Sequence, residues 1–144
     1  MRILFILAIL AFIATSCSDK TSSLKGRWEL DEIDYTEHYK SIPAEVREKI
    51  RTAMNHAFRK LKGKTFFTFS ENEKLTLEAP NFLNVVKKTE GNWKMNDAQD
   101  SLSFIFADEV ENYRIDQISA DSLILSTSDV PARTLILLRK YWKD

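Results

Sequence analysis

Very few side chains in this chain are suited to covalent or metal chemistry. The sequence contains one cysteine, Cys17, and two histidines, His38 and His56. A single cysteine cannot form an intramolecular disulfide, and three protein ligands for a catalytic zinc ion would need carboxylates at no recognisable spacing. We therefore expect no disulfide and no metal site.

Catalysis by the other polar residues has equally little support. A serine nucleophile needs a histidine that a carboxylate orients. His38 lies in a polar segment beside Glu37 and His56 lies within a helical pattern, and neither has a nucleophile at a telling spacing. The three glycines are isolated and form no phosphate-binding loop. We expect neither an enzyme nor a bound cofactor.

Cys17 follows a segment with the features of a secretion signal. Arg2 supplies one positive charge, residues 3–13 are all apolar, and residues 14–16 are small or polar. The apolar run is too short to cross a bilayer, which takes roughly 20 residues. It fits the roughly 7 to 15 apolar residues of a signal-peptide core. We predict a signal peptide over residues 1–16.

The stretch Ile13-Ala14-Thr15-Ser16-Cys17 resembles the lipobox of bacterial lipoproteins, in which the cysteine thiol is acylated. Ala14 replaces the usual leucine, and looser lipoboxes of this kind are similar to those of Bacteroidetes. The resemblance implies a lipid such as palmitate on Cys17 and a place on the outer membrane, on either face. The alternative is a plain signal peptide with an incidental thiol. We predict that residues 17–23 form the lipidated cysteine and a flexible tether.

The overall charge argues against nucleic acid as a partner. Lys and Arg together number 21, as do Asp and Glu, and loss of residues 1–16 removes only Arg2. Binding to a phosphate backbone needs a basic surface that releases counterions. We therefore expect no nucleic-acid binding.

One amphipathic helix is expected over residues 44–61. Pro43 just before it and Gly63 just beyond it mark its bounds. Apolar residues within it recur at spacings of four, four, four and three, which places them on one face: Val46, Ile50, Met54, Phe58 and Leu61.

From residue 64 onward, apolar and polar residues alternate with a period of two, which is typical of β-strands. Turn-forming residues separate these segments at regular spacing, and a first strand is expected within residues 24–34. Residues 24–144 are therefore predicted to form one mainly β domain. We expect an antiparallel up-and-down β-barrel of about eight strands, with the helix between the first and second strands, because closure removes exposed edges.

Gly26-x-Trp28 on the first strand, followed by this series of hairpins, resembles the lipocalin superfamily, specifically the lipocalin-like domains of bacterial lipoproteins. The resemblance covers most of residues 24–144. It implies that Arg139, near the end of the last strand, packs over Trp28 to close the barrel. The helix position is similar to that in fatty-acid-binding proteins, which implies a cap on the barrel mouth. The alternative is a helix on the outer wall, against Ile136 or Leu138.

The barrel interior is the candidate ligand site. Its predicted lining is the inward face of the strands: Trp28, Leu30, Phe67, Phe69, Trp93, Met95, Phe104, Phe106, Tyr113, Leu125 and Leu137. A hollow interior would bind a small hydrophobic molecule. An interior filled by these large rings would favour an interaction module with a protein partner in the cell envelope. An eight-stranded barrel allows either, so the sequence leaves both functions open.

Overall fold

The computed structural model describes residues 19–127 and 133–142, so the predicted signal peptide and Cys17 lie outside the described residues. The helices are α2 (Lys20–Leu24), α3 (Thr36–Lys40) and α4 (Ala44–Leu61). The strands are β1 (Gly26–Asp34), β2 (Phe66–Phe69), β3 (Lys74–Pro80), β4 (Val86–Met95), β5 (Ser101–Phe106), β6 (Glu109–Ile118), β7 (Ser122–Thr127) and β8 (Leu135–Lys140).

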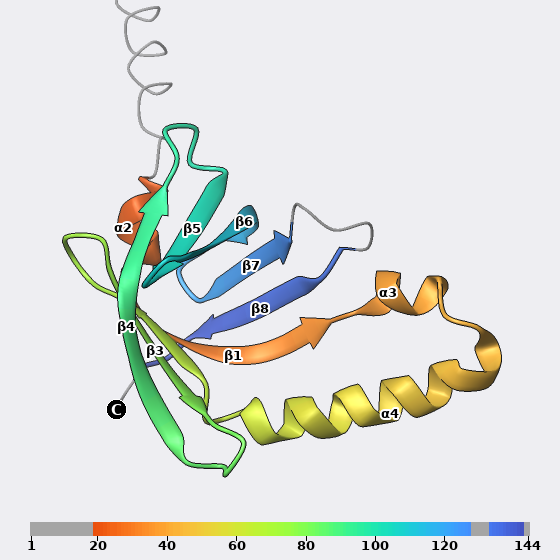
Figure 1. The fold of residues 1–144 in the computed structure, drawn as a ribbon. Coiled ribbons are helices and arrows are strands. Elements are labelled where there is room, and N and C mark those ends of the chain that lie inside the picture. Colours follow the sequence, from red (N-terminus) through yellow and green to blue (C-terminus); the bar gives the residue numbers. More distant parts are fainter. Residues whose placement is uncertain (1–18, 128–132, 143–144) are drawn as a thin grey trace, which may run out of the picture.

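The eight strands close into one barrel (Figure 1). Each strand is antiparallel to its neighbour in sequence, and β1 also pairs with β8. Every strand therefore has two partners, which removes the open edges of a sheet. The predicted up-and-down barrel, with a helix between the first two strands, is confirmed. It is complete within the described residues.

Two β-bulges change which residues face the interior. The register of β1 against β8 shifts after Leu30, so Leu30 and Ile33 both point inward although they are three positions apart. The register of β6 against β7 shifts after Ile115, and Ile118 packs against the core in the same way. A bulge adds one residue to one strand of a pair, so strict alternation fails beyond it.

The segment before β1 is part of the folded domain. The carboxylate of Asp19 accepts a hydrogen bond from the backbone N–H of Thr21 at 3.0 Å and so caps α2. The backbone N–H and the ammonium group of Lys20 both donate to Gln99, at 3.1 and 2.9 Å, and Leu24 is fully buried. The predicted flexible tether is therefore wrong for residues 19–23. The local sequence could not show this, because the residue that holds the segment, Gln99, lies far along the chain in the turn between β4 and β5.

α4 begins and ends where the sequence predicted, but only its C-terminal half packs. Phe58 and Leu61 lie against the core, whereas Val46 and Ile50 are exposed. Figure 1 shows α4 extending away from the barrel, and its contacts are mainly with β1 and β3. The helix therefore leans on the rim of the barrel mouth. Packing on Leu138 at the outer wall is wrong, because Leu138 is buried inside the barrel.

Gly91 allows β4 and β5 to approach closely. A Cβ atom at this position would lie 2.3 Å from the carbonyl oxygen of Ile105 and 2.6 Å from the ring of Phe106. Trp93, two positions later, points into the core. The absence of a side chain at Gly91 thus leaves room for the ring of Phe106 inside the barrel.

Candidate functional site

Core side chains occupy the end of the barrel that α2 covers. Trp28 from β1 is fully buried, and its indole N–H donates to the carbonyl of Leu24 at 2.7 Å. Trp93 from β4 packs against Phe69 with ring centroids 6.0 Å apart, and its indole N–H donates to the carbonyl of Ser70 at 3.2 Å. Both indole groups therefore have the partner that a buried N–H requires.

The cation over Trp28 is Lys140, and the expectation that Arg139 takes this place is wrong. Lys140 Nζ lies 4.4 Å from the ring centroid of Trp28 and donates to the carbonyl of Ser23 at 3.3 Å. Burial lowers the pKa of Lys140. Arg139 points outward, with a side chain that is 69% exposed, and forms an ion pair with Asp31 at 2.9 Å.

The same shift of one position makes the prediction for Leu137 wrong. Residues 135–138 are all apolar, so their alternation does not show which face is buried. Pairing with Leu30 of β1 and Leu123 of β7 places Leu138 in the core. Leu137 pairs with Glu32 and lies on the outer side of β8.

The other ten residues predicted to line the interior lie in the core or pack against it: Trp28, Leu30, Phe67, Phe69, Trp93, Met95, Phe104, Phe106, Tyr113 and Leu125. Phe104 lies at the centre of this set, with its ring centroid 5.8 Å from Phe67, 5.7 Å from Phe69 and 5.0 Å from Tyr113. Burial raises the pKa of Tyr113 above its ordinary value, as does the hydrogen bond that its hydroxyl donates to Glu111. The rings thus fill the middle of the barrel with one another.

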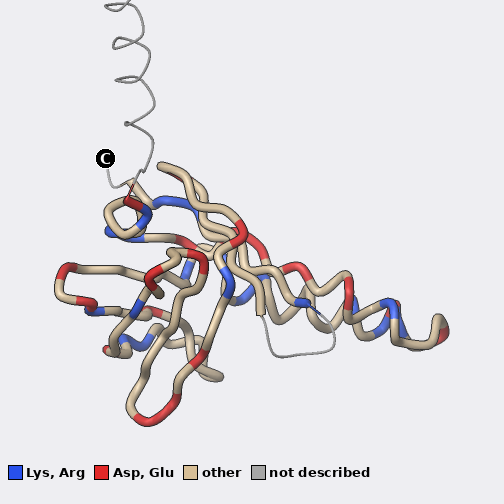
Figure 2. Tube along the Cα trace, turned by 90° about the horizontal axis from the view of Figure 1, so that it is seen from above, with Lys and Arg blue, Asp and Glu red and all other residues tan. Residues whose placement is uncertain are grey.

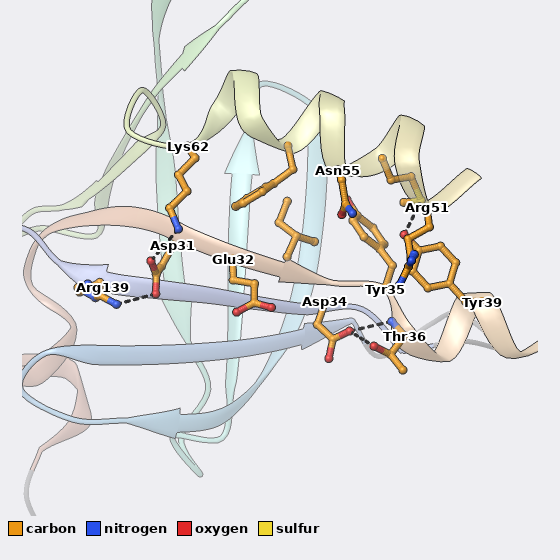
Figure 3. A pocket seen from close by; sticks show the side chains of 13 residues that line it. Asp31, Glu32, Asp34, Tyr35, Thr36, Tyr39, Arg51, Asn55, Lys62 and Arg139 are labelled. Carbon is orange, nitrogen blue, oxygen red and sulfur yellow. Dashed lines mark hydrogen bonds and ion pairs between the residues drawn. The ribbon is translucent and has the colours of Figure 1, made fainter. Parts of the chain in front are cut away.

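A groove of about 530 Å³ lies between the end of β1, α3 and α4, at the end of the barrel beside α3 and α4 (Figure 3). Its apolar lining consists of Ile33, Tyr35, Tyr39, Met54 and Phe58. Ile33 and Phe58 also pack against the core, so the floor of the groove continues into the barrel interior. This volume falls within the range of small-molecule sites, roughly 300 to 1,000 Å³.

Charged side chains at one end of the groove compensate one another. Asp31 accepts a hydrogen bond from Arg139 at 2.9 Å and lies 3.5 Å from Lys62 (Figure 3). Glu32 lines the groove beside them. Two carboxylates and two cations cancel, so this end of the groove suits a polar group of low net charge.

The opposite end of the groove carries the two tyrosines and Arg51 (Figure 3). The hydroxyl of Tyr39 donates to the sulfur of Met54 at 3.4 Å, which ties α3 to α4. Burial raises the pKa of Tyr35 above its ordinary value. Arg51 is held by Glu48 at 2.8 Å. These contacts form a wall of rings and thioether with hydrogen-bonding groups at its rim.

Hydrogen bonds hold the polar groups near this end of the groove. Asp34 accepts hydrogen bonds from the side chain and backbone of Thr36, which lower the pKa of the carboxyl. Nε2 of His38 lies 2.8 Å from the hydroxyl of Thr134, which links α3 to the start of β8. Over residues 19–127 and 133–142, no three His, Cys, Asp and Glu side chains are grouped so that they could hold a metal ion.

Membrane attachment was predicted at Cys17, outside the described residues. Within the described part of the chain, no helix combines the length and the apolar character needed to span a bilayer.

Sequence reasoning did not identify this groove, although part of its signal was present. Met54 and Phe58 belong to the apolar face predicted for α4. Tyr35 and Tyr39 are four positions apart, the spacing of one helical face, but they lie in a short segment that was not predicted as helix. Ile33 was missed because the bulge in β1 turns it inward.

Comparison with solved structures shows that the chain has the lipocalin-like fold. A lipocalin-like protein from Bacteroides uniformis matches with a TM-score of 0.54 and 15% identity, over 83% of this chain and 99% of that one. An uncharacterized protein from Bacteroides eggerthii matches with a TM-score of 0.52 and 12% identity, over 82% and 99%. A DUF4847 family protein from Bacteroides vulgatus matches with a TM-score of 0.51 and 14% identity, over 84% and 96%. No family model matches the sequence, and neither does any curated protein.

Proposed function

We propose that this lipocalin-like barrel binds a small hydrophobic molecule in the groove between β1, α3 and α4, without catalysing a reaction. The observation that carries the proposal is the continuity of the groove with the core. Ile33 and Phe58 line the groove and also pack against the interior residues. A ligand there would bury apolar surface against Ile33 and Phe58, which the core already holds in place.

The centre of the barrel is a poorer place for a ligand. The rings around Phe104 contact one another at centroid distances of 5.0 to 5.8 Å. A guest among them would have to separate aromatic contacts worth roughly 0.5 to 1.5 kcal/mol each. We therefore place the ligand in the groove beside α3 and α4, and not in the barrel interior.

The groove favours an amphipathic ligand of low net charge. Its middle is formed by Ile33, Met54 and Phe58, whereas hydrogen-bonding groups lie at its ends. Tyr35 at one end is a neutral phenol, and burial raises its pKa above the ordinary value of 10. The apolar part of the ligand would lie across the middle, with a polar group at either end.

Binding can be tested with a fluorescent fatty-acid analogue and two matched tryptophan substitutions on α4. Met54→Trp places an indole inside the groove and should weaken binding at least about ten-fold, a loss of about 1.4 kcal/mol. Val46→Trp is the control, because Val46 belongs to the same helix face but lies outside the groove. Equal affinities of the two variants would place the ligand elsewhere. No binding of the analogue, and no small molecule co-purifying in native mass spectrometry, would overturn the proposal.

We also propose that Cys17 carries a lipid that holds the protein on the outer membrane. The apolar run over residues 3–13 and the small residues before Cys17 support it. α2 begins three residues later, so the lipid would hold the barrel by the end that α2 covers. Several acyl chains on one residue anchor firmly, at roughly 0.8 kcal/mol for each buried CH₂.

Metabolic labelling with an alkyne analogue of palmitate tests the anchor. The wild-type chain should take up the label and sediment with outer membranes. Cys17→Ser should lose the label and appear in the soluble fraction. An unlabelled wild-type protein would rule out the anchor without affecting the ligand proposal.

A further inference from the structure

The hairpin between β3 and β4 exposes large apolar side chains at its end. We define residues 80–88 as the β3–β4 tip. Phe82 is 94% exposed, Leu83 67%, Val85 56% and Val86 51%. Exposed apolar residues are unremarkable when scattered singly, but a contiguous group marks an interaction surface. Figure 1 shows this hairpin projecting beyond the barrel at the end opposite α2.

The loop geometry keeps these side chains outside. The side-chain oxygen of Asn81 accepts hydrogen bonds from the backbone N–H groups of Leu83 and Val85, both at 3.0 Å. The backbone N–H of Asn81 donates to the carbonyl of Val85 at 2.9 Å. These bonds fix the turn internally, and Phe82, which lies between Asn81 and Leu83, remains almost fully exposed.

Basic residues surround the tip, and acidic ones are missing from it. No Asp or Glu occurs from residue 79 to residue 89, whereas Lys87 and Lys88 follow Val86 directly. The ammonium group of Lys64 donates to Asn84 of the tip at 3.1 Å, and Lys60 lines the same groove as Phe82. Elsewhere the two signs are interspersed, as Figure 2 shows along α4. The tip therefore differs from the neutral rest of the chain.

The face of α4 beside the tip carries small and apolar residues together with His56 and Lys60. Ala53, Ala57 and Leu61 of α4 face Pro80 and Phe82 across a groove of about 660 Å³. Among the described residues, Lys60, Lys64 and Lys87 form no ion pair. The surface thus combines a narrow apolar projection with lysines whose charges are free to meet an outside partner.

We propose that the β3–β4 tip and this face of α4 dock on a bilayer surface that contains anionic lipids. Phe82 and Leu83 would enter the boundary between headgroups and acyl chains, and the lysines would meet the headgroups. A bilayer fits better than a protein, because a standard protein interface buries roughly 1,200 to 2,000 Å² on complementary shapes. A projecting hairpin offers a small convex end, which an interface of mobile lipids accepts.

The two ends of β4 set the orientation on the membrane. The tip includes Val86, the first residue of β4, and at the other end of the strand Met95 accepts a hydrogen bond from Thr21 of α2 at 3.8 Å. A strand of ten residues is roughly 30 Å long. With an acyl anchor on Cys17, contact at both ends would lay β4 along the bilayer. The docking itself requires neither the anchor nor the groove between β1 and α4.

The test uses the chain from Ser18 onward, which holds the complete barrel and lacks the apolar segment and Cys17. Because Cys17 is the only cysteine, a polarity-sensitive fluorophore can be attached at one introduced thiol. Leu83→Cys reports on the tip. Trp142→Cys is the matched control, because Trp142 is equally exposed, at 68%, but follows β8 at the end that α2 covers.

With vesicles of equal parts phosphatidylcholine and phosphatidylglycerol, the label at position 83 should shift to the blue and become protected from iodide. The label at position 142 should do neither. Phe82→Ser should weaken partitioning at least about ten-fold. Lys60→Gln with Lys64→Gln should weaken it about 25-fold, at about five-fold for each charge near an anionic surface.

Two controls separate docking from general attraction. Lys74→Gln with Lys94→Gln removes two exposed lysines away from the tip and should leave partitioning unchanged. Vesicles of phosphatidylcholine alone should bind far more weakly. Absence of the shift at position 83, or an equal shift at position 142, would overturn the proposal. A self-association in sedimentation that Phe82→Ser abolishes would overturn it in favour of a second copy on the tip.

Discussion

Two adjacent cations at the end of β8, Arg139 and Lys140, should contribute unequally to stability, because only Lys140 lies over Trp28 at the end of the barrel that α2 covers. Lys140→Met and Arg139→Met each remove one positive charge and keep an unbranched side chain. Lys140 lies over the ring of Trp28 at 4.4 Å and donates to the carbonyls of Ser23 and Lys25. Arg139 makes an exposed ion pair with Asp31. The two variants therefore compare a cation that packs inside the end of the barrel covered by α2 with a cation on the outer surface.

The contacts of Lys140 set the expected magnitude. A cation over an aromatic ring contributes about 1 kcal/mol at a partly exposed site. Two hydrogen bonds from a charged group add about 1 kcal/mol each once solvent screening is considered. The partial desolvation that lowers the pKa of Lys140 acts against this gain. We expect Lys140→Met to reduce the free energy of unfolding by about 2 kcal/mol, and Arg139→Met by less than about 1 kcal/mol, as for exposed ion pairs.

Urea unfolding at neutral pH, followed by tryptophan fluorescence, measures both variants. Trp28 and Trp93 are buried and should report loss of the core. The free energy of unfolding should fall with urea concentration at the same slope as in the wild type, so that a shift of the midpoint reflects stability alone. A loss for Arg139→Met equal to or larger than that for Lys140→Met would refute the assignment of the inward face of β8.

Four further substitutions test other parts of the fold. Gly91→Ala should cost at least about 2 kcal/mol because the new Cβ meets the carbonyl of Ile105; Gly63→Ala, at a φ of +73°, should cost only about 1 kcal/mol in urea unfolding, and the reverse order would contradict the close approach of β4 to β5. Leu24→Ala should lower the free energy of unfolding by about 2 to 5 kcal/mol; a change near zero would contradict the packing of α2 against the barrel core. Asp34 has a folded pKa below its ordinary 3.8, so the stability it contributes is present above that pH and is lost as pH falls through the folded value. Asp34→Asn should therefore lose less stability than the wild type between neutral pH and about pH 3, and equal losses on acidification would count against the role of this carboxylate.

Local patterns were enough for α4 and for the succession of strands, but they missed the short helices α2 and α3. The bounds of α4 follow from Pro43, Gly63 and the spacing of apolar residues between them. The succession of short strands follows from an alternation of period two, which the pleated backbone imposes on any strand with one buried face. Ten of the eleven predicted interior residues are inside for the same reason. Closure was expected because eight antiparallel strands remove their open edges by pairing the first strand with the last.

Tertiary contacts decided what local alternation cannot express. In β8 the apolar run over residues 135–138 fits either face, and only the register against Leu30 and Leu123 places Leu138 inside and Lys140 over Trp28. The bulge after Leu30 turns Ile33 inward and so creates the floor of the candidate groove. These choices depend on residues far apart in sequence, whose pairing sets the face of each strand, whereas alternation within a strand is the same for either face.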